Sequence, residues 1–504
     1  MTIKILMLVI FFGVMLAIGF YCRKHATDVN GFVLGGRSVG PWLTAFAYGT
    51  SYFSAVVFVG YAGQFGYKYG LASTWIGIGN AVLGSLVAWV VLGRRTRIMS
   101  KHLGSMTMPD FFGKRYDSQS LRIAASVIAF IFLIPYTASV YNGLSYLFGM
   151  AFDVDFRICV VVMAVLTGVY VIIGGYMATA WNDLIEGIIM LFGIVAVIAA
   201  VLSGHGGFMA AVKELAQVPS SVMPGAYASF LGPDPANLFG VVILTSLGTW
   251  GLPQMIQKFY AIKDEKAVHT GTIISTLFAI VVSGGCYFLG GFSRISGVKE
   301  AVDGTVKYDT IIPTMLSSLP DILIGIVIVL VLSASMSTLS SLVLTSSSTL
   351  TLDFIKPLFV KKMNEKQQLV WMRVLLAGFI LISVVIALDP PAFIAQLMGI
   401  SWGALAGAFL APFLYGLYWK GVTRAAVWAS FICGVGITVA NMFFRFIASP
   451  INAGAFAMVA GLVIVPVVSL ISPKLKKETV EDVFHCLEEK VMVEQKLALP
   501  EEEE

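Results

Sequence analysis

The stretch TSLGTWGLPQMIQ, residues 245–257, places Gly248, Gly251 and Pro253 close together in an otherwise apolar span. Glycine weakens a helix through its backbone freedom, and proline lacks the amide hydrogen that an unbroken helix requires. We therefore expect this span to break. A second stretch, FAYGTSYFSAVVFVGYAGQFG at residues 46–66, mixes Gly, Ser and Thr into an apolar run and is expected to break as well. Close packing between helices is the alternative explanation for these glycines.

The surrounding sequence has the composition of a polytopic membrane protein. Of its 504 residues, 58% are hydrophobic and 12% are charged, whereas a soluble domain carries about 25% charged residues. At about 20 residues per crossing we expect an all-α fold of about thirteen transmembrane helices. The expected spans are 5–22, 43–66, 72–93, 122–150, 157–179, 184–203, 237–257, 270–293, 311–352, 370–389, 392–418, 425–447 and 453–472. The long span at 311–352 is predicted to be a short helix, a break at Pro320 and a long helix from about residue 322.

The two expected breaks fall in the second and seventh spans, so each opens a block of five helices. Discontinuous helices at corresponding places in two halves indicate an inverted-repeat transporter. The predicted organisation is one transmembrane domain at 1–475, followed by a charged and mobile cytoplasmic tail at 476–504. Within the domain we expect a leading helix at 5–22, a first core repeat at 43–203, a second at 237–418 and trailing helices at 425–472.

The segment VLSASMSTLSSLVLTSSSTLTLDF, residues 331–354, is crowded with hydroxyl groups. Small and hydroxyl residues at i, i+3 and i+4 steps share one helix face; they are Ala334, Ser337, Thr338, Ser341, Thr345 and Ser348. Neutral oxygens at membrane depth suit a small hard cation. Ser and Thr also serve helix packing and bond to the i−4 carbonyl, so both interpretations stay open. For 346–351 we favour packing, or the wetted wall of a cation exit.

Two acidic residues, Asp183 and Glu186, fall at the cytoplasmic entry to a span. A carboxylate inside a membrane usually has a partner or a task, but Asp183 is also a candidate helix N-cap. No nucleotide-binding motif and no cysteine spacing for a metal is present, so neither ATP-driven transport nor an organic cofactor is expected. We likewise expect no nucleic acid and no obligatory protein partner.

The basic residues predict the orientation in the lipid bilayer. Assigning alternate loops to alternate sides gathers most of the 33 Lys and Arg residues on one side, Lys258, Lys263 and Lys266 among them. The positive-inside rule makes that side cytoplasmic, which places the N-terminus outside and the C-terminus inside. The expected location is the plasma membrane.

Four motifs, in order along the chain, resemble those of a known family: FVLGGRSVGPW at 32–42, GGYMATAWNDLIEG at 174–187, LPQMIQKFYAIKD at 252–264 and SASMSTLSSLVLTSSS at 333–348. They resemble the sodium:solute symporter family, which includes proline, pantothenate, sialic-acid and sodium–glucose transporters. The resemblance runs through nearly all of residues 1–475. It implies a LeuT-like fold with two inverted five-helix repeats, one leading helix and two trailing helices, and Na⁺ as the coupling ion.

The resemblance also implies a sodium site between the first and eighth core helices. Its matching carbonyls are those of Thr50, Phe53 and Ala334, and its matching hydroxyls are those of Ser337 and Thr338. Asp183 matches an aspartate that supports sodium from the fifth core helix. Ser341 and Ser335 match a second sodium site in members that have one.

This chain also departs from the family pattern. Proline-transporting members have an aspartate at the position of Tyr52, and sialic-acid members have an arginine in the third core helix, where residues 123–150 contain no basic residue. The mixture of Ser, Tyr and Gly after residue 48 is closer to pantothenate-type members.

The predicted function is sodium-coupled import of a small organic solute, such as an amino acid, vitamin or organic acid, by alternating access. Polar or aromatic groups on the broken and facing helices are the candidate solute-pocket residues: Tyr52, Ser54, Gln64, Tyr136, Asn142, Trp250, Gln254 and Trp402. A packing role is the alternative for each. A membrane solute sensor on the same fold is the alternative function, disfavoured because the chain ends soon after its last span. An enzyme is not expected, since no catalytic cluster converges at membrane depth.

Overall fold

The computed structural model describes residues 2–152, 155–297, 306–389 and 393–498. Within these ranges the chain is helical, and its only β-type pairing is an isolated parallel bridge between Val39 and Ile262. Ten helices in this part are long and apolar enough to cross a membrane, or up to eleven if one bent pair is counted as a span. The all-α membrane architecture is therefore confirmed, whereas the total of about thirteen crossings stays a prediction.

The first half of the described chain comprises α1 (Thr2–Cys22), α2 (Val29–Leu34), α3 (Pro41–Tyr52), the π-helical η3 (Val56–Tyr61), α4 (Ala62–Tyr69), α5 (Thr74–Gly79), η5 (Asn80–Val87), η6 (Trp89–Gly93), α6 (Arg94–His102), α7 (Met108–Arg115), α8 (Gln119–Phe152), α9 (Phe156–Gly204) and α10 (Phe208–Ala216).

The second half comprises α11 (Pro235–Leu247), η8 (Gly248–Trp250), α12 (Pro253–Ala261), α13 (Glu265–Gly290), α14 (Ile311–Leu316), α15 (Asp321–Thr349), η11 (Leu350–Ile355), α16 (Lys356–Leu358), α17 (Glu365–Leu388), α18 (Ile394–Tyr418), α19 (Arg424–Phe444), α20 (Pro450–Ile471) and α21 (Lys477–Ala498). Short 3-10 turns join several of these helices: η1 (Arg23–His25), η2 (Gly35–Arg37), η4 (Gly70–Ser73), η7 (Ala226–Ala228), η9 (Ser293–Ile295) and η10 (Tyr308–Thr310). The predicted break at Pro320 is confirmed, because this proline directly precedes α15.

Helix α9 contains two of the predicted spans. Its 49 residues would extend for about 74 Å at 1.5 Å per residue, more than twice the thickness of a bilayer core, which is about 30 Å. Gly175 interrupts the helix with φ 55° and ψ −151°, a conformation that residues with a Cβ rarely adopt. The chain changes direction at this glycine, so Asp183 lies inside the second part of α9.

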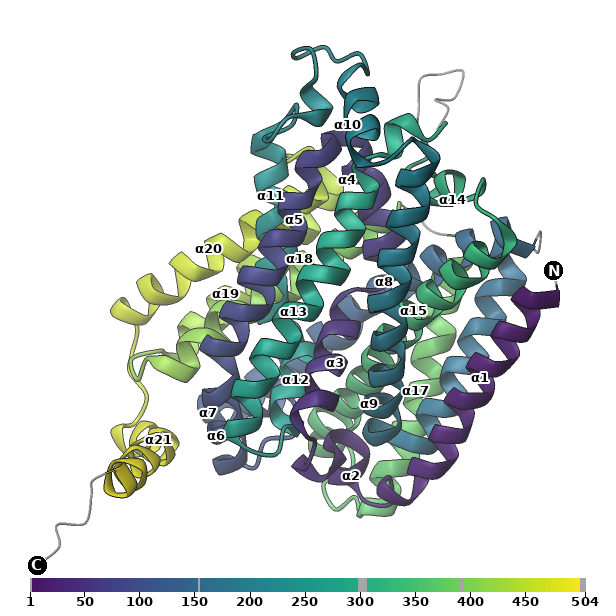
Figure 1. Ribbon diagram of the computed structural model, residues 1–504. Helices are drawn as coiled ribbons and strands as arrows, with labels where there is room; N and C mark the ends of the chain where they lie inside the picture. Colours follow the sequence, from purple (N-terminus) through teal and green to yellow (C-terminus); the bar gives the residue numbers. More distant parts are fainter. Residues whose placement is uncertain (1, 153–154, 298–305, 390–392, 499–504) are drawn as a thin grey trace, which may run out of the picture.

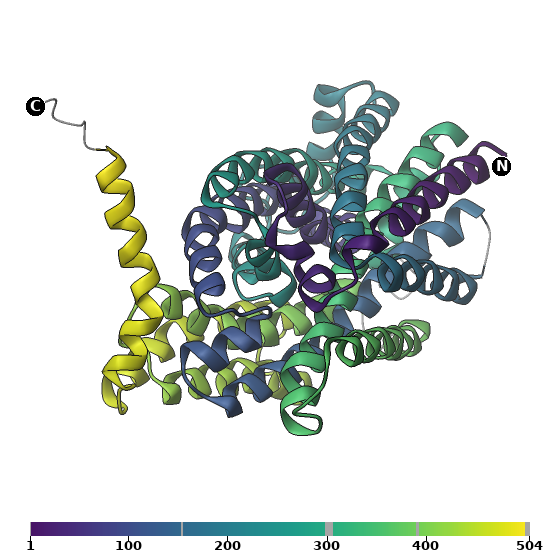
Figure 2. The same ribbon diagram turned by 90° about the horizontal axis from the view of Figure 1, so that it is seen from below.

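Helices α3, α12 and α15 lie in the interior of the bundle (Figure 1). Helix α15 is almost entirely buried, because α1, α3, α8, α9 and α17 all pack against it. Helix α1 runs along one edge, and α19 and α20 form the opposite edge, where both pack against α18 (Figures 1 and 2). The hydroxyl-rich segment is thus at the centre of the protein and faces other helices.

Residues 46–66 show both expected features, a helix break and a close packing contact, at different positions. The helix is interrupted at Phe53 and Ser54, between α3 and η3. Gly66 instead permits a close helix crossing, because a Cβ there would lie 2.1 Å from the carbonyl carbon of Gly290 in α13. The break and the close contact are therefore separate features of one span.

The tail differs from its prediction. We expected a mobile extension, but Lys477–Ala498 forms helix α21, which packs against α6. Val480, Val483 and Phe484 are buried at this contact, and the guanidinium of Arg115 lies 4.9 Å from the ring centre of Phe484. The apolar residues of α21 hold this part of the tail against the bundle. The terminal glutamates lie outside the described residues.

Candidate cation and solute site

Two helices are interrupted at the centre of the bundle, as the sequence predicts. Helix α3 ends at Tyr52, and Ser54 begins the next helical segment, since its Oγ accepts a hydrogen bond from the amide of Val56 at 3.1 Å. The second interruption bends the segment formed by α11 and η8 by 42° relative to α12. Each interruption releases backbone groups from helical hydrogen bonding.

Five oxygen atoms from α3 and α15 meet beside the first interruption. The hydroxyl of Ser337 lies 3.1 Å from the carbonyl oxygen of Thr50 and 3.2 Å from that of Ala334. The hydroxyl of Thr338 lies 3.3 Å from the Thr50 oxygen, 3.4 Å from the Ser51 oxygen and 3.1 Å from the Ala334 oxygen. We call these five oxygens the α3–α15 oxygen cluster. All five residues are buried.

The cluster holds more acceptor oxygens than protons. Three carbonyls can only accept hydrogen bonds, and the hydroxyls of Ser337 and Thr338 supply one proton each. A small cation would satisfy the remaining lone pairs. The distance from a hard cation such as calcium to its oxygen ligands is about 2.3–2.6 Å. Two ligand oxygens at right angles around such an ion are therefore about 3.3–3.7 Å from each other. The separations of 3.1–3.4 Å in the cluster are close to this spacing.

Phe53 occupies the residue after α3. Its amide donates to the carbonyl of Gly49 at 3.1 Å, which completes the last helical turn. Its ψ of 83° turns its own carbonyl away from the helical direction, and its ring stacks on Tyr52 with the centroids 4.2 Å apart. Among the described residues, no hydrogen bond ties the Phe53 carbonyl to the α3–α15 oxygen cluster, so its role as a sodium ligand stays a prediction.

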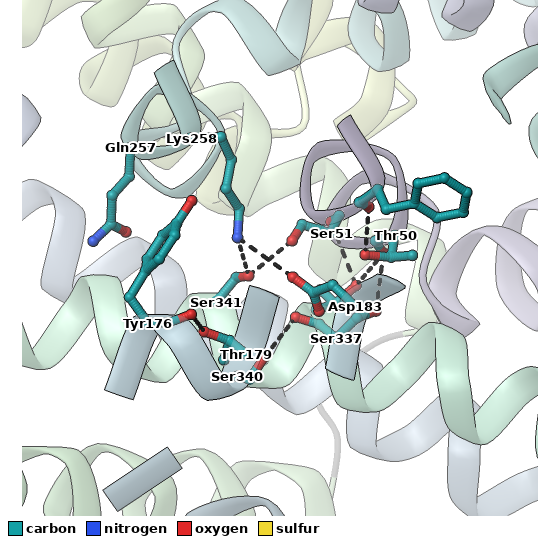
Figure 3. A network of polar contacts seen from close by, with 12 residues as sticks. Thr50, Ser51, Tyr176, Thr179, Asp183, Gln257, Lys258, Ser337, Ser340 and Ser341 are labelled. Carbon is teal, nitrogen blue, oxygen red and sulfur yellow. Dashed lines mark hydrogen bonds and ion pairs between the residues drawn. The ribbon is translucent and has the colours of Figure 1, made fainter. Parts of the chain in front are cut away.

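A second polar group lies next to the cluster along α15 (Figure 3). The hydroxyl oxygens of Ser51 and Ser341 are 2.8 Å apart, and the ammonium of Lys258 in α12 donates to the Ser341 hydroxyl at 2.9 Å. The same ammonium lies 3.7 Å from the carboxylate of Asp183 in α9. Four helices thus contribute to one buried polar network.

The structure decides between the two interpretations of Asp183. It lies eight residues after Gly175, inside α9, so it does not cap a helix. Its side chain is fully buried and its ion-pair partner is Lys258. Glu186, one turn further, is also fully buried, and its carboxylate has no hydrogen-bond partner among the described residues.

Three of the candidate solute-pocket residues form an aromatic cluster beside the first interruption. The ring of Trp402 in α18 lies 6.0 Å from that of Tyr52 and 5.8 Å from that of Tyr136 in α8. Gly248 of the second interruption packs directly against Trp402, because a Cβ there would lie 2.4 Å from its ring. The aromatic cluster therefore touches both interrupted helices.

The other candidates vary in their distance from this cluster. Ser54 lies in the first interruption, and Asn142 is buried in α8, where its neighbour Gly143 packs against Ala55. Gln254 is the second residue of α12 and is buried, and neither of its amide atoms has a hydrogen-bond partner among the described residues.

Two candidates have partners elsewhere. The indole nitrogen of Trp250 donates to the carbonyl of Leu83 at 3.0 Å. Gln64 lines a separate cavity of about 650 Å³ with Lys68, Asp234 and Asn452, so the structure does not bring it to the aromatic cluster.

Lys258 is a central residue of this network, and its role was not predicted from the sequence. It was counted among the loop residues of the basic side, whereas it is 2% exposed within α12. The only signal for it was that LPQMIQKFY continues as a helix beyond Pro253. Ser51 was missed as well, and so was the buried Gln257, which accepts a hydrogen bond from Thr345 of the hydroxyl face at 2.5 Å.

Interrupted helices that meet around an oxygen-rich centre inside a helical bundle define an ion-coupled secondary transporter. The chain belongs to the sodium:solute symporter family, whose family model matches residues 32–434. It is 28% identical over 486 residues to the sodium/proline symporter of Staphylococcus aureus, strains JH9 and NCTC 8325 / PS 47 among others, covering 94% of this chain and 93% of the relative.

Two solved structures show the same fold. One is the substrate-bound outward-open state of a Na⁺-coupled sialic acid symporter, with a TM-score of 0.76, 16% identity and coverage of 94% of this chain and 99% of the other. The second is a nucleobase-cation-symport-1 family transporter in a closed conformation, with a TM-score of 0.55, 13% identity and coverage of 90% and 97%. The predicted LeuT-like fold is confirmed, and the chain is a sodium-coupled, multi-pass membrane transporter.

Proposed function

We propose that this protein imports a small organic solute by alternating access, and that the sodium ion driving import binds in the α3–α15 oxygen cluster. This proposal is supported by three carbonyl oxygens and two hydroxyl oxygens that meet at a helix interruption. Each hydroxyl oxygen lies 3.4 Å or less from at least two of the carbonyl oxygens. The membrane is the plasma membrane, and the basic side of the protein faces the cytoplasm. The symporter relatives favour transport over a solute sensor.

The position of the cluster explains how sodium would be coupled to solute. Thr50 and Phe53 flank Tyr52, which belongs to the aromatic cluster. A sodium ion held by Thr50, Phe53 and α15 would fix the interruption of α3 and thereby the orientation of Tyr52. Bound sodium then stabilises the outward-facing state that accepts solute, because an ion can shift an equilibrium only toward the state it binds more tightly.

The membrane potential supplies enough free energy for this coupling. One charge that moves inward across 100 mV releases about 2.3 kcal/mol, and about 1.4 kcal/mol corresponds to a tenfold ratio. Voltage alone would therefore support roughly 40-fold accumulation of a neutral solute per sodium ion.

We propose a monocarboxylate, such as pantothenate, as the solute. The N-terminus of α12 starts at Pro253 and supplies the positive end of a helix dipole for a carboxylate. Gln254, whose amide has no partner in the part of the chain that the structure describes, lies at this end, and Trp402 and Tyr136 offer apolar surface. The hydroxyl of Tyr52 donates a hydrogen bond to the carbonyl of Thr245. Because this residue is a tyrosine, its position supplies no carboxylate to pair with a solute amine. That favours a solute other than proline.

Uptake into proteoliposomes tests the proposal. A thermal-shift screen of amino acids, vitamins and monocarboxylates first selects the solute, and its radiolabelled form is then offered with an inward sodium gradient or with choline in place of sodium. We expect concentrative uptake only with sodium. Equal uptake in both conditions would exclude sodium coupling.

A further inference from the structure

The ammonium of Lys258 occupies a position that resembles a cation site. The side chain is 2% exposed, and its nitrogen contacts the Ser341 hydroxyl at 2.9 Å, the Asp183 carboxylate at 3.7 Å and the face of the Tyr176 ring at 5.2 Å from its centre. A hydroxyl, a carboxylate and an aromatic face all attract a monovalent cation. Figure 3 shows Lys258 reaching from α12 toward Ser341 and Asp183.

The carboxylate of Asp183 is stabilised by the positive charge at this place. It is fully buried, and a buried carboxylate without a cation is strongly unfavourable. Among the described residues, Lys258 is the basic side chain that lies within ion-pair distance of it. The lysine therefore supplies what a bound ion would otherwise have to supply.

This position adjoins the α3–α15 oxygen cluster. Ser341 follows Ser337 by four residues and Thr338 by three, so the three hydroxyls share one face of α15, with about one helical turn between them. The Ser341 hydroxyl contacts that of Ser51, whose carbonyl belongs to the cluster. Oxygen atoms thus continue from the cluster to a second position, between Ser341 and Asp183, where the Lys258 ammonium lies.

We propose that Lys258 is a built-in cation that fills the second of these positions, so that the transporter binds one sodium ion in each cycle. The inference rests on the proposed sodium site in the oxygen cluster. The ammonium donates a hydrogen bond to Ser341, forms an ion pair with Asp183 and repels any sodium ion that would enter between them. Removing the ammonium while keeping Asp183 converts this position into a sodium site.

The experiment measures equilibrium binding of radioactive sodium to the purified full-length protein. We expect about one sodium ion per wild-type protein and about one for Lys258→Arg, which keeps the charge. Lys258→Met keeps most of the side-chain stem and removes the nitrogen; it should bind about two sodium ions, with a Hill coefficient above one. One ion per protein in Lys258→Met, or two in the wild type, would overturn the proposal. No specific binding by the wild type would instead overturn the sodium site itself.

A second variant keeps the test decisive if Lys258→Met folds poorly. The double variant with Asp183→Asn removes both charges, so it should fold and bind about one sodium ion. In Lys258→Met alone, sodium should replace the missing charge, so its Tm should rise with sodium concentration about twice as steeply as that of the wild type. A Lys258→Met protein whose folding or Tm does not improve in sodium relative to choline would contradict the proposal.

Discussion

Ser337 and Thr50 are 287 residues apart in the sequence, yet the Ser337 hydroxyl donates to the Thr50 carbonyl at 3.1 Å. This contact joins the interruption of α3 to the hydroxyl-rich face of α15. The helix α3 ends at Tyr52, so the carbonyls of its last turn are free to accept hydrogen bonds from other helices. The buried helix α15 packs against this end of α3 and supplies the Ser337 hydroxyl. The same arrangement brings the aromatic cluster of Tyr52, Tyr136 and Trp402 next to the oxygen cluster.

The two buried carboxylates of α9 should respond differently to neutralisation. Asp183→Asn leaves the Lys258 ammonium buried without its ion-pair partner, which we expect to cost about 3–5 kcal/mol and to lower the Tm clearly. Glu186→Gln removes a carboxylate that has no hydrogen-bond partner among the described residues, so the Tm should stay the same or rise. Thermal unfolding followed by tryptophan fluorescence compares the two. Equal losses would show that the Asp183–Lys258 pair does not stabilise the fold.

The helix crossing at Gly66 should not tolerate a methyl group. A Cβ there would lie 2.1 Å from the backbone of Gly290, so Gly66→Ala must separate α4 and α13 at a cost of about 1–3 kcal/mol or more. Gly378→Ala in α17 is the matched control, because its Cβ meets nothing within 4 Å. We expect a lower Tm and a smaller monodisperse fraction for Gly66→Ala alone. A wild-type Tm for this variant would contradict the crossing.

Arg122, near the start of α8, should stabilise the contact between α8 and η11. It pairs with the buried Asp353 at 2.8 Å and with Asp110 at 3.2 Å, so Arg122→Gln leaves a buried charge and should cost about 3–5 kcal/mol. Arg424→Gln breaks an exposed pair with Asp117 and should cost at most about 1 kcal/mol. Chemical or thermal unfolding of both variants checks the difference. Comparable small losses would mean that the Arg122 pairs are no stronger than a surface pair.

Asp309 predicts a pH dependence of stability. Burial raises the pKa of Asp309 from 3.8 to about 6, although the amide of Ile394 donates to its carboxylate and opposes the rise. Because the pKa is higher in the folded state, the stabilising contribution is complete below pH 4 and is lost as the pH rises through 6. The loss is at most about 3 kcal/mol.

Asp309→Asn does not titrate and can still accept the Ile394 hydrogen bond. The Tm of the wild type should therefore fall relative to that of Asp309→Asn between pH 4 and pH 7.5. A Tm difference that is constant over this range would exclude the effect of Asp309.

Much of the fold was predictable because it depends on local chemistry. Gly248, Gly251 and Pro253 disfavour a continuous helix whatever surrounds them, and the interruption occurs there. The hydroxyl face of 331–354 follows from helical periodicity alone. The contact of Ser337 and Thr338 with Thr50 was expected from the family resemblance, since no local property relates residues so distant in the sequence.

The polar network around Asp183 was not predictable in the same way. The helix containing Asp183 begins after the turn at Gly175, earlier than the apolar run suggests, and this removed the N-cap interpretation. Lys258 was assigned to a loop because a lysine near the end of an apolar span is normally solvated. Its burial depends on Asp183, which is distant in the sequence and contacts it only in the folded protein.

Sodium is proposed to bind between the interruption of α3 and the hydroxyls of α15. Sodium binding to the purified protein tests it most directly, with Ser337→Ala/Thr338→Ala compared with Ser347→Ala/Ser348→Ala. The second pair removes two buried hydroxyls of the same helix that bond only within α15. We predict that the first double variant raises the half-saturating sodium concentration at least about tenfold, a loss of about 1.4 kcal/mol, while the second changes it less than about twofold. Unchanged sodium affinity in Ser337→Ala/Thr338→Ala would contradict sodium binding in the α3–α15 oxygen cluster.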